Sequence, residues 1–558
     1  MSWRALLLTA TCATAIAAQD HVLGSTGPIA DVVEALAIDG DGDGRAELVV
    51  VRRDGRATRH VCTDAGLVAR GTLRLADPHH TLFAFADVAP APGIEFVVAD
   101  GGGTGWLRWP DDDGERDAEP VPLARRARLS LRTDAPQRSP FVRDLDRDGR
   151  LDLLLPTRDG VRPFVQEATD DGDDTPRFRA LPTLPVPVQS AVERAERGRA
   201  RELRGSLVVP QLETDDLDGD GRPDLLTRDG QRHAFWLLGE DGGFREPIVV
   251  DLAQFRDSTP KAAVELGSTL VASDRQLLQR GDIDGDGIPD FVIAHRRKVW
   301  TFLAGRDGPQ FTKARTQAVA DDVTAMLLVD LDDDGRGDLL TFQVQLPGVG
   351  ALLLGLVQSI DIDVKCVGYR SEDSAFGNLP QWRRTVTLRV PPVLTLLGQQ
   401  EELVQRFLDI VNKTRLGVRG AFTGGAANDL ALVRADGGAI ELFAGDDAPP
   451  KLDSARGRRL MRELLFEDPA TVFDLDRVFA LVSGLVDELS GALVGERAPR
   501  ATLPLRDPEQ WRVVDLFAGE FDGQAGDELV VAYVTADADE AAPRVYDLLR
   551  WPSNDGPK

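Results

Sequence analysis

The stretch that decides the fold is DIDGDGIPDFVIA, residues 282–294. Its carboxylates fall at positions 1, 3, 5 and 9 of a short loop, as Asp282, Asp284, Asp286 and Asp290. A hard cation such as calcium takes about six to eight oxygen ligands, which alternate residues of a tight loop can supply. Gly287, at position 6, allows the turn that brings the carbonyl of position 7 back toward such an ion. The apolar run FVIA that follows predicts a buried strand.

The same pattern recurs at four other places, and each loop is named here by the number of its first residue. Loops 39, 144, 216 and 330 are intact like loop 282, and each leads into an apolar run. The predicted ligands are the carboxylates at positions 1, 3, 5 and 9 and the backbone carbonyl at position 7. They are Asp39, Asp41, Asp43, Arg45 and Glu47; Asp144, Asp146, Asp148, Arg150 and Asp152; Asp216, Asp218, Asp220, Arg222 and Asp224; Asp282, Asp284, Asp286, Ile288 and Asp290; and Asp330, Asp332, Asp334, Arg336 and Asp338.

Three degraded copies keep the loop length and the following strand. Loops 87 and 421 lack most of the acids and are interpreted as bare turns. Loop 520 is a possible weak site because it keeps Glu520, Asp522 and Glu528.

An EF-hand loop begins in a similar way, but it needs a bidentate Glu at position 12 and a helix on each side. Position 12 is apolar or Thr in every intact loop, and a strand-like run follows. These residues are Val50, Leu155, Thr227, Ile293 and Thr341. The sequence therefore argues against an EF-hand.

The repeating unit is longer than the loop. Residues 32–38 predict a strand before loop 39, and an Asp-Gly hairpin turn follows the strand after it. Third strands are predicted at 105–109, 233–238, 299–304 and 439–444, and a fourth strand at 245–252. A four-stranded antiparallel sheet buries both faces only when such sheets stack, as in a propeller. We therefore predict an all-β fold, a β-propeller of four-stranded blades, with eight blades or alternatively seven.

The domain plan has one propeller over residues 19–558, with insertions at about 166–205, 343–418 and 453–508. Helical periodicity predicts helices over 399–413 and 468–494, and the polar segment 189–203 is predicted to be partly helical. The last blade lacks a fourth strand in sequence, and residues 19–29 are predicted to supply it.

Composition and the N-terminus bear on location. A formal net charge of −27 argues against nucleic acid or an anionic membrane as partner. Residues 1–18 resemble a signal peptide, with one positive charge, an apolar segment and Ala15-Ile16-Ala17 before the expected cleavage point. No other run is long and apolar enough for a transmembrane segment. The chain is thus expected to be secreted, periplasmic or at the cell surface. Cys62 and Cys366 lie in distant repeats and are expected to be unpaired.

The loops resemble the FG-GAP repeat of integrin alpha-chain propellers and the related VCBS-type repeats of bacterial secreted proteins. That resemblance implies calcium, about five ions, bound in a loop between the first two strands of each blade. The Phe-Gly and Gly-Ala-Pro signatures are absent, and position 9 of loop 39 is Glu47, so the bacterial secreted form is nearer.

Function is predicted from these features together. The leading hypothesis is a secreted calcium-binding propeller that acts as a binding or adhesion module for a carbohydrate, cell-surface or protein partner. An enzyme is not expected, because no Gly-x-Ser-x-Gly, His-Glu-x-x-His or glycine-rich phosphate motif occurs. The alternatives are an extracellular enzyme of polysaccharide lyase or hydrolase type, or a purely structural envelope component.

Overall fold

The structure is a computed structural model that describes a large part of the chain. The described residues are 21–89, 92–110, 113–129, 133–168, 176–186, 188–197, 200–208, 212–257, 275–345, 354, 357–372, 375–392, 395, 406, 416–423, 429–445, 472–480, 483–484, 498–538 and 542–551. The predicted signal peptide and most of helix 399–413 lie outside them.

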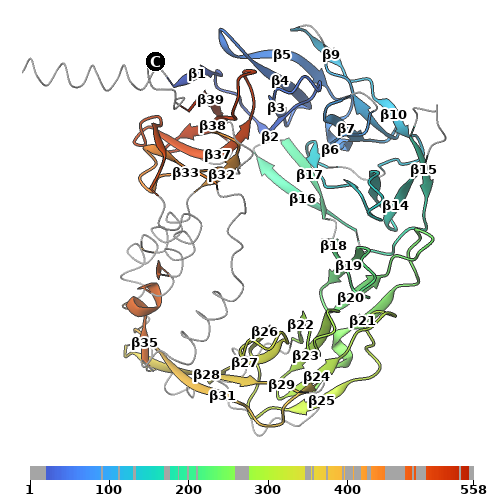
Figure 1. Ribbon diagram of the computed structural model, residues 1–558, viewed down its shortest axis with the longest axis vertical. Coiled ribbons are helices and arrows are strands. Elements are labelled where there is room, and N and C mark those ends of the chain that lie inside the picture. The colour runs from blue at the N-terminus through green and yellow to red at the C-terminus, as the bar shows by residue number, and fades with distance from the viewer. Residues whose placement is uncertain are drawn as a thin grey trace, which may run out of the picture. The chain divides into compact units, whose positions relative to one another are not determined.

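The chain divides into two compact units (Figure 1). The first comprises Met1–Val209, Arg415–Pro449 and Leu493–Lys558, and the second comprises Pro210–Thr414 and Pro450–Ala492. Both are built from antiparallel sheets of four main strands, so the predicted all-β class is confirmed.

The first unit holds five such sheets. The strands of each sheet are given in the order in which they pair. The sheet of loop 39 consists of β2 (Val32–Ile38), β3 (Glu47–Arg52), β4 (Arg56–Thr63), β5 (Gly66–Arg74) and β9 (Glu115–Asp117), and the sheet of loop 87 of β10 (Val121–Ala124), β8 (Thr104–Leu107), β7 (Glu95–Ala99), β6 (Leu82–Ala86) and β11 (Gln137–Arg138). The sheets of loops 144, 421 and 520 consist of β12 (Val142–Arg143), β13 (Asp152–Thr157), β14 (Gly160–Glu167) and β15 (Arg177–Ala180); of β32 (Gly417–Gly420), β33 (Asp429–Val433), β34 (Ala439–Phe443) and β36 (Ala501–Pro504); and of β1 (Val22–Ser25), β39 (Val545–Leu549), β38 (Glu528–Thr535) and β37 (Trp511–Gly519). The short strands β9 and β11 add to sheet edges in parallel.

The second unit holds three. They are β18 (Glu213–Asp215), β19 (Asp224–Asp229), β20 (Arg232–Trp236) and β21 (Ile248–Asp251); β22 (Leu277–Gly281), β23 (Asp290–His295), β24 (Lys298–Phe302) and β25 (Arg315–Ala318); and β26 (Ala325–Val329), β27 (Asp338–Gln345), β28 (Ile360–Tyr369), β31 (Trp382–Val390) and β35 (Val472–Asp474). The second unit also holds a small ladder, β29 (Ser371–Glu372) with β30 (Ala375–Phe376), and the 3₁₀ turn Leu252–Gln254. Another 3₁₀ turn, Pro78–His80, lies in the first unit.

Every loop of the repeat joins the first and second strands of one sheet. The predicted strand 32–38 is β2, and the predicted third and fourth strands coincide with β8, β20, β24, β34 and β21 to within a few residues. The N-terminal prediction is also confirmed, because β1 pairs antiparallel with β39 and places Val22 opposite Leu549.

The core lies between neighbouring sheets. Within the first unit, Val49 and Val51 of β3 face the sheet of loop 87, whereas Leu48 and Val50 face the sheet of loop 520. Alternate residues of a strand point to opposite faces, so a second strand that is covered on both sides must be apolar throughout. This double burial explains why each loop is followed by a continuous apolar run.

Neighbouring sheets of one unit are also joined at their loops. The N–H of position 8 donates to the carbonyl of position 1 in the preceding loop. The pairs are Ile94 to Asp39 (2.7 Å), Gly337 to Asp282 (2.6 Å), Asp527 to Ala421 (3.2 Å) and Ala46 to Glu520. Loops 216 and 282 carry Pro223 and Pro289 at position 8 and have no N–H to donate there.

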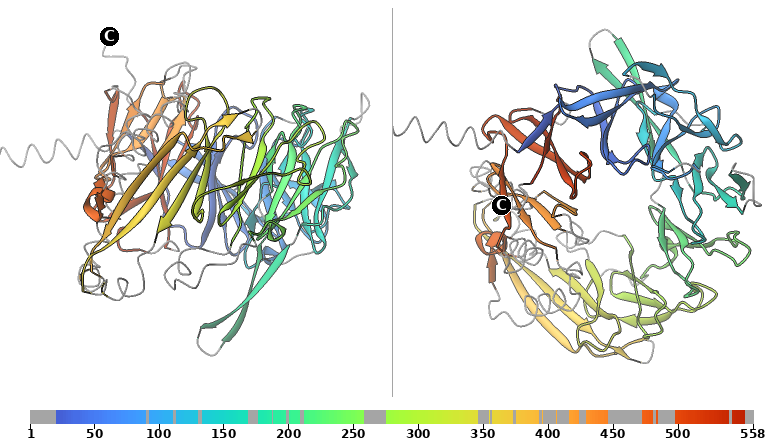
Figure 2. Two further views of the ribbon diagram at one scale, coloured as in Figure 1. Left: turned by 90° about the horizontal axis from the view of Figure 1, so that it is seen from below. Right: turned by 45° about the horizontal axis from the view of Figure 1, so that its top comes forward.

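Three sequence predictions need correction. Residues 189–203 are not helical: β16 (Gln189–Arg197) and β17 (Ala200–Val208) form a hairpin that pairs with no other sheet (Figure 2). The two-residue link Gly198-Arg199 was the overlooked hairpin signal. Part of the predicted helix 468–494 is the strand β35, and only 475–480 and 483–484 are helical among its described residues. All three predicted insertions contain strands of the repeat: β15 lies within 166–205, β28 and β31 within 343–418, and β36 within 453–508.

Candidate metal-binding loops

The carboxylate at position 1 organises each intact loop by accepting backbone hydrogen bonds. In loop 282, Asp282 Oδ1 accepts from Gly285 N at 2.6 Å and Oδ2 from Gly287 N at 2.9 Å. Gly287 has φ of +85°, and the position-6 glycines of the other four intact loops have φ between +84° and +87°. No heavy atom stands within 4 Å of a Cβ built at Gly287, so the backbone conformation, not lack of space, requires glycine there.

The carboxylate at position 9 lies buried beneath the loop and ties it to the third strand. Asp290 is 1% exposed, and its two oxygens accept from Ile283 N at 2.9 Å and Ala304 N at 2.8 Å. Asp152, Asp224 and Asp338 accept the equivalent pairs of bonds at 2.8–2.9 Å. Position 9 therefore has a structural role that the sequence prediction, which made it a ligand alone, had missed.

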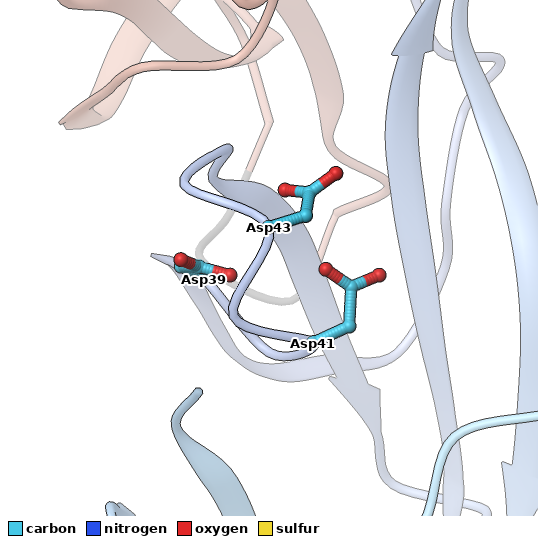
Figure 3. Close-up of side chains that lie close together, drawn as sticks. All are labelled: Asp39, Asp41 and Asp43. Atoms are coloured by element: carbon cyan, nitrogen blue, oxygen red, sulfur yellow. The ribbon is translucent and has the colours of Figure 1, made fainter. Parts of the chain in front are cut away.

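Three carboxylates of each intact loop converge. In loops 144, 216, 282 and 330 they are positions 1, 3 and 9, with one oxygen of each within 4.8 Å of the others. In loop 39 the converging three are instead positions 1, 3 and 5, which are Asp39, Asp41 and Asp43 (Figure 3).

The position-5 carboxylate of every intact loop also accepts a hydrogen bond from the backbone of its own loop. Asp43, Asp148, Asp220, Asp286 and Asp334 accept from the N–H of position 7 at 2.8–3.0 Å. Position 7, which is Arg45, Arg150, Arg222, Ile288 or Arg336, is thereby folded back over the loop, and its carbonyl remains a predicted ligand.

Gathering these carboxylates carries an electrostatic cost. Burial raises the pKa of Asp152, Asp224, Asp290 and Asp338 to about 6. Burial, and then the neighbouring position-5 carboxylate, also raises the pKa of Asp146, Asp218 and Asp284. A divalent cation would reverse both effects, because it favours the ionised form.

The donor set fits a hard cation. Asp144 Oδ1 and Asp332 Oδ1 are buried and accept no hydrogen bond, so each leaves a lone pair that a metal ion could use. The converging groups are all carboxylate oxygens, which calcium and magnesium prefer over nitrogen or sulfur. Asp144, Asp146 and Asp152, with their equivalents in the other loops, would hold the ion.

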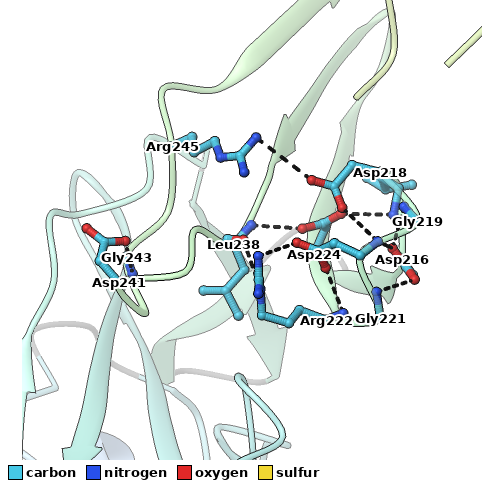
Figure 4. Close-up of polar contacts among 12 residues, drawn as sticks. Asp216, Asp218, Gly219, Gly221, Arg222, Asp224, Leu238, Asp241, Gly243 and Arg245 are labelled. Atoms are coloured by element: carbon cyan, nitrogen blue, oxygen red, sulfur yellow. Dashed lines mark hydrogen bonds and ion pairs between the residues drawn. The ribbon is translucent and has the colours of Figure 1, made fainter. Parts of the chain in front are cut away.

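Arginine side chains also reach several loops. In loop 216, Arg245 Nη1 lies 3.8 Å from Asp218 Oδ2 (Figure 4). In loop 330, Arg370 Nε lies 2.7 Å from Asp332 Oδ2. In loop 39, Arg59 Nη1 contacts both Asp41 and Glu47, a contact that the sequence analysis did not predict.

The degraded loops keep the position-9 contact and lose the acids above it. In loop 87, Glu95 accepts from Val88 N at 2.8 Å. In loop 421, Asp429 accepts from Thr423 N at 2.9 Å and Gly445 N at 2.8 Å. In loop 520, Glu528 accepts from Phe521 N, while Asp522 and Glu528 both form ion pairs with Arg550. The predicted weak site is thus already paired with a protein cation.

A separate polar crevice of about 340 Å³ lies in the second unit. Gln343, Lys365 and Thr385 face it from adjacent positions on β27, β28 and β31. Gln343 is 1% exposed, and neither its amide oxygen nor its amide nitrogen has a hydrogen-bond partner. Lys365 pairs with Asp321 at 2.7 Å, and the lining also includes Arg383 and Arg384, so the lining is cationic overall.

One protein-family model matches part of the chain. Residues 282–341 match the model of the FG-GAP-like repeat. Residues 282–341 are therefore an FG-GAP-type repeat, and the resemblance of the loops to that repeat is confirmed. The matched segment runs from loop 282 through loop 330 into β27.

Other comparisons are weak. No curated protein matches the chain. Among solved structures, an Agrocybe aegerita lectin described as recognising non-reducing terminal N-acetylglucosamine is 13% identical, with a TM-score of 0.24, covering 64% of this chain and 91% of that one. A structure of BBS1N in complex with ARL6DN is 9% identical, with a TM-score of 0.22, covering 96% and 95%. Similarity this low supports no functional argument.

In the part of the chain that the structure describes, no helix is long and apolar enough to cross a membrane.

Proposed function

We propose that this chain is a secreted, calcium-stabilised β-propeller that serves as a binding module. The observation that carries the calcium proposal is the convergence of positions 1, 3 and 9 in four separate loops. One acidic turn is unremarkable, but the same three positions meeting in four copies favours one shared ligand. The ion would offset the repulsion among the carboxylates and tie each loop to its sheet.

Calcium binding by the full chain, stripped of metal and titrated calorimetrically, tests this. We expect binding that weakens when Asp284, at position 3 of loop 282, is replaced by Asn. Asp229→Asn is the matched control, because Asp229 is the exposed last residue of β19 and lies outside every acidic loop. An equal effect of both substitutions, or no binding by the unaltered chain, would refute the calcium proposal.

The partner is proposed to be a carbohydrate bearing acidic groups, with the crevice at Gln343 as its place of binding. Support comes from a cationic lining in a chain of net charge −27, and from a buried amide that lacks both a donor and an acceptor. A side-chain amide can donate hydrogen bonds to sugar hydroxyls through its nitrogen and accept them through its oxygen, while Lys365 and Arg383 would attract a carboxylate or sulfate group.

Binding of oligogalacturonate and of sulfated oligosaccharides, compared with neutral cello-oligosaccharides, tests the partner proposal. We expect selective binding of the acidic sugars, which Gln343→Ala weakens and Gln381→Ala, at an exposed position before β31, does not. If the neutral sugars bind equally well, or if both variants bind alike, the crevice is not the binding place.

A further inference from the structure

Three loops of the repeat carry Glu at position 9, namely Glu47 in loop 39, Glu95 in loop 87 and Glu528 in loop 520, whereas loops 144, 216, 282 and 330 carry Asp. Among these three, loop 87 has Ala89 at position 3, while loops 39 and 520 keep an acid there. Both loops belong to the first unit, and their sheets are neighbours, because Ala46 N donates to the carbonyl of Glu520. Glu has one methylene more than Asp, so its carboxylate extends further from the same backbone position.

The longer acid meets an arginine of its own sheet in both loops. Arg59 belongs to the third strand β4, and its Nη1 lies 2.9 Å from Asp41 Oδ2 and 3.1 Å from Glu47 Oε1. One nitrogen thus bridges positions 3 and 9. Arg550 follows the third strand β39 and bridges the same two positions of loop 520. It pairs with Asp522 through Nη2 and lies 3.5 Å from Glu528 Oε1 through Nε.

Loop 39 gathers a different set of carboxylates from the Asp-closed loops. In loops 144, 216, 282 and 330 positions 1, 3 and 9 converge, whereas in loop 39 positions 1, 3 and 5 converge. The Arg59 side chain is only 10% exposed, so it cannot swing into water to admit an ion. Arg245 and Arg370 also touch position 3 of their loops, yet their side chains are 45% and 44% exposed and no ion pair links them to position 9.

A guanidinium and a metal ion cannot occupy the space between the same two carboxylates. Expelling Arg59, whose side chain is 10% exposed, would leave its charge unpaired, which is costly. The Arg550 side chain is 33% exposed, and it holds positions 3 and 9 of loop 520 through two different nitrogens. We infer that loops 39 and 520 are closed by an internal arginine in place of calcium. The chain then binds four ions, in loops 144, 216, 282 and 330. This inference rests on the proposed calcium function and names the loops that carry it out.

The test is the number of calcium ions bound to the metal-stripped full chain, measured by equilibrium dialysis with radioactive calcium. Asp284→Asn and Asp41→Asn both alter position 3, the first in an Asp-closed loop and the second in an arginine-closed loop. We expect about four ions on the unaltered chain, one fewer on Asp284→Asn, and no loss on Asp41→Asn. One ion lost from each variant, or five ions on the unaltered chain, would overturn this inference alone. No bound calcium at all would overturn the proposed function with it.

Arg59→Gln provides a second and opposite expectation. Removing the guanidinium frees Asp41 and Glu47 for a metal, so this variant should bind one ion more than the unaltered chain. Its melting temperature should also rise further on addition of calcium. Loss of an ion from Arg59→Gln would show that the arginine supports a bound metal, and the inference would be wrong.

Discussion

The two roles of the loop carboxylates can be separated by two substitutions in loop 282. Asp290 at position 9 accepts two buried backbone N–H groups, from Ile283 and Ala304. Asp290→Ala leaves both donors without an acceptor, at a cost of about 1–3 kcal/mol each. Asp284 at position 3 accepts only one exposed backbone bond, 3.3 Å long, from Asp286. Asp284→Ala should therefore cost under about 1 kcal/mol when no metal is bound.

Urea unfolding without metal measures this difference. It should be carried out near pH 5.5, below the raised pKa of Asp290 of about 6, so that relief of a buried charge does not mask the lost hydrogen bonds. We expect Asp290→Ala to lower the free energy of unfolding by about 2–6 kcal/mol, with Asp284→Ala close to the unaltered chain.

Adding calcium at pH 7.5 should reveal the second role. The free energy of unfolding of the unaltered chain should rise by about 2.7 kcal/mol per site when calcium is in hundredfold excess over its dissociation constant. Asp284→Ala should lose the part of this stabilisation that comes from loop 282. The reasoning is refuted if Asp290→Ala unfolds like the unaltered chain without metal, or if the two variants are equally destabilised there.

Three further predictions concern other parts of the molecule. Because burial raises the pKa of the position-9 aspartates to about 6, the folded state holds protons that the unfolded state has released. The stability of the metal-free protein should then fall as pH rises from about 4 to about 6, while the stabilisation by calcium grows over the same range. Melting temperatures of the metal-free protein that do not change with pH would contradict this. Arg506→Ala should cost about 3–5 kcal/mol, because Asp547 is 4% exposed and accepts from Arg506 Nε at 2.6 Å and Nη2 at 2.7 Å. Chemical denaturation measures that cost, and adding Asp547→Asn should recover part of it. Removing residues through Ser25 deletes β1 and exposes the edge of β39, so the melting temperature should fall and light scattering should report association; an unchanged melting temperature would mean that β1 adds nothing.

The strand that follows each acidic loop was predictable because its signals are local. Residues 282–294 contain the loop, its turn glycine and the following strand in one stretch. The pairing of β1 with β39 was also predictable, since the last sheet lacked a strand and an N-terminal segment was unassigned.

The contacts of position 9 could not be read from the sequence in the same way. Asp290 meets Ala304, 14 residues later, only because β23 and β24 pair in one particular register. The Arg59 contact with Glu47 likewise depends on register across β3 and β4, and no spacing rule of a metal loop includes it. A Glu at position 9 was visible, but its meaning depended on a side chain from another strand.

Structure outside the repeat was predicted least well. The segment 189–203 is rich in Arg and Glu, which favour helices, yet backbone pairing from Gln189 opposite Val208 to Arg197 opposite Ala200 forms the hairpin β16–β17. Strand β35 lies within the segment 468–494, whose periodicity predicted a helix, and it pairs in parallel with the edge of β31. Tertiary context outweighed local preference in both cases.

Thermal unfolding of the full chain, first with calcium and then with excess chelator, tests the central claim most directly. The bound ions should be counted on the same sample. A calcium-tied protein should lose several ions on chelation, and its melting temperature should drop sharply, because each ion stabilises only the folded state. An unchanged melting temperature with no bound calcium would mean that the acidic loops are turns held by their own hydrogen bonds.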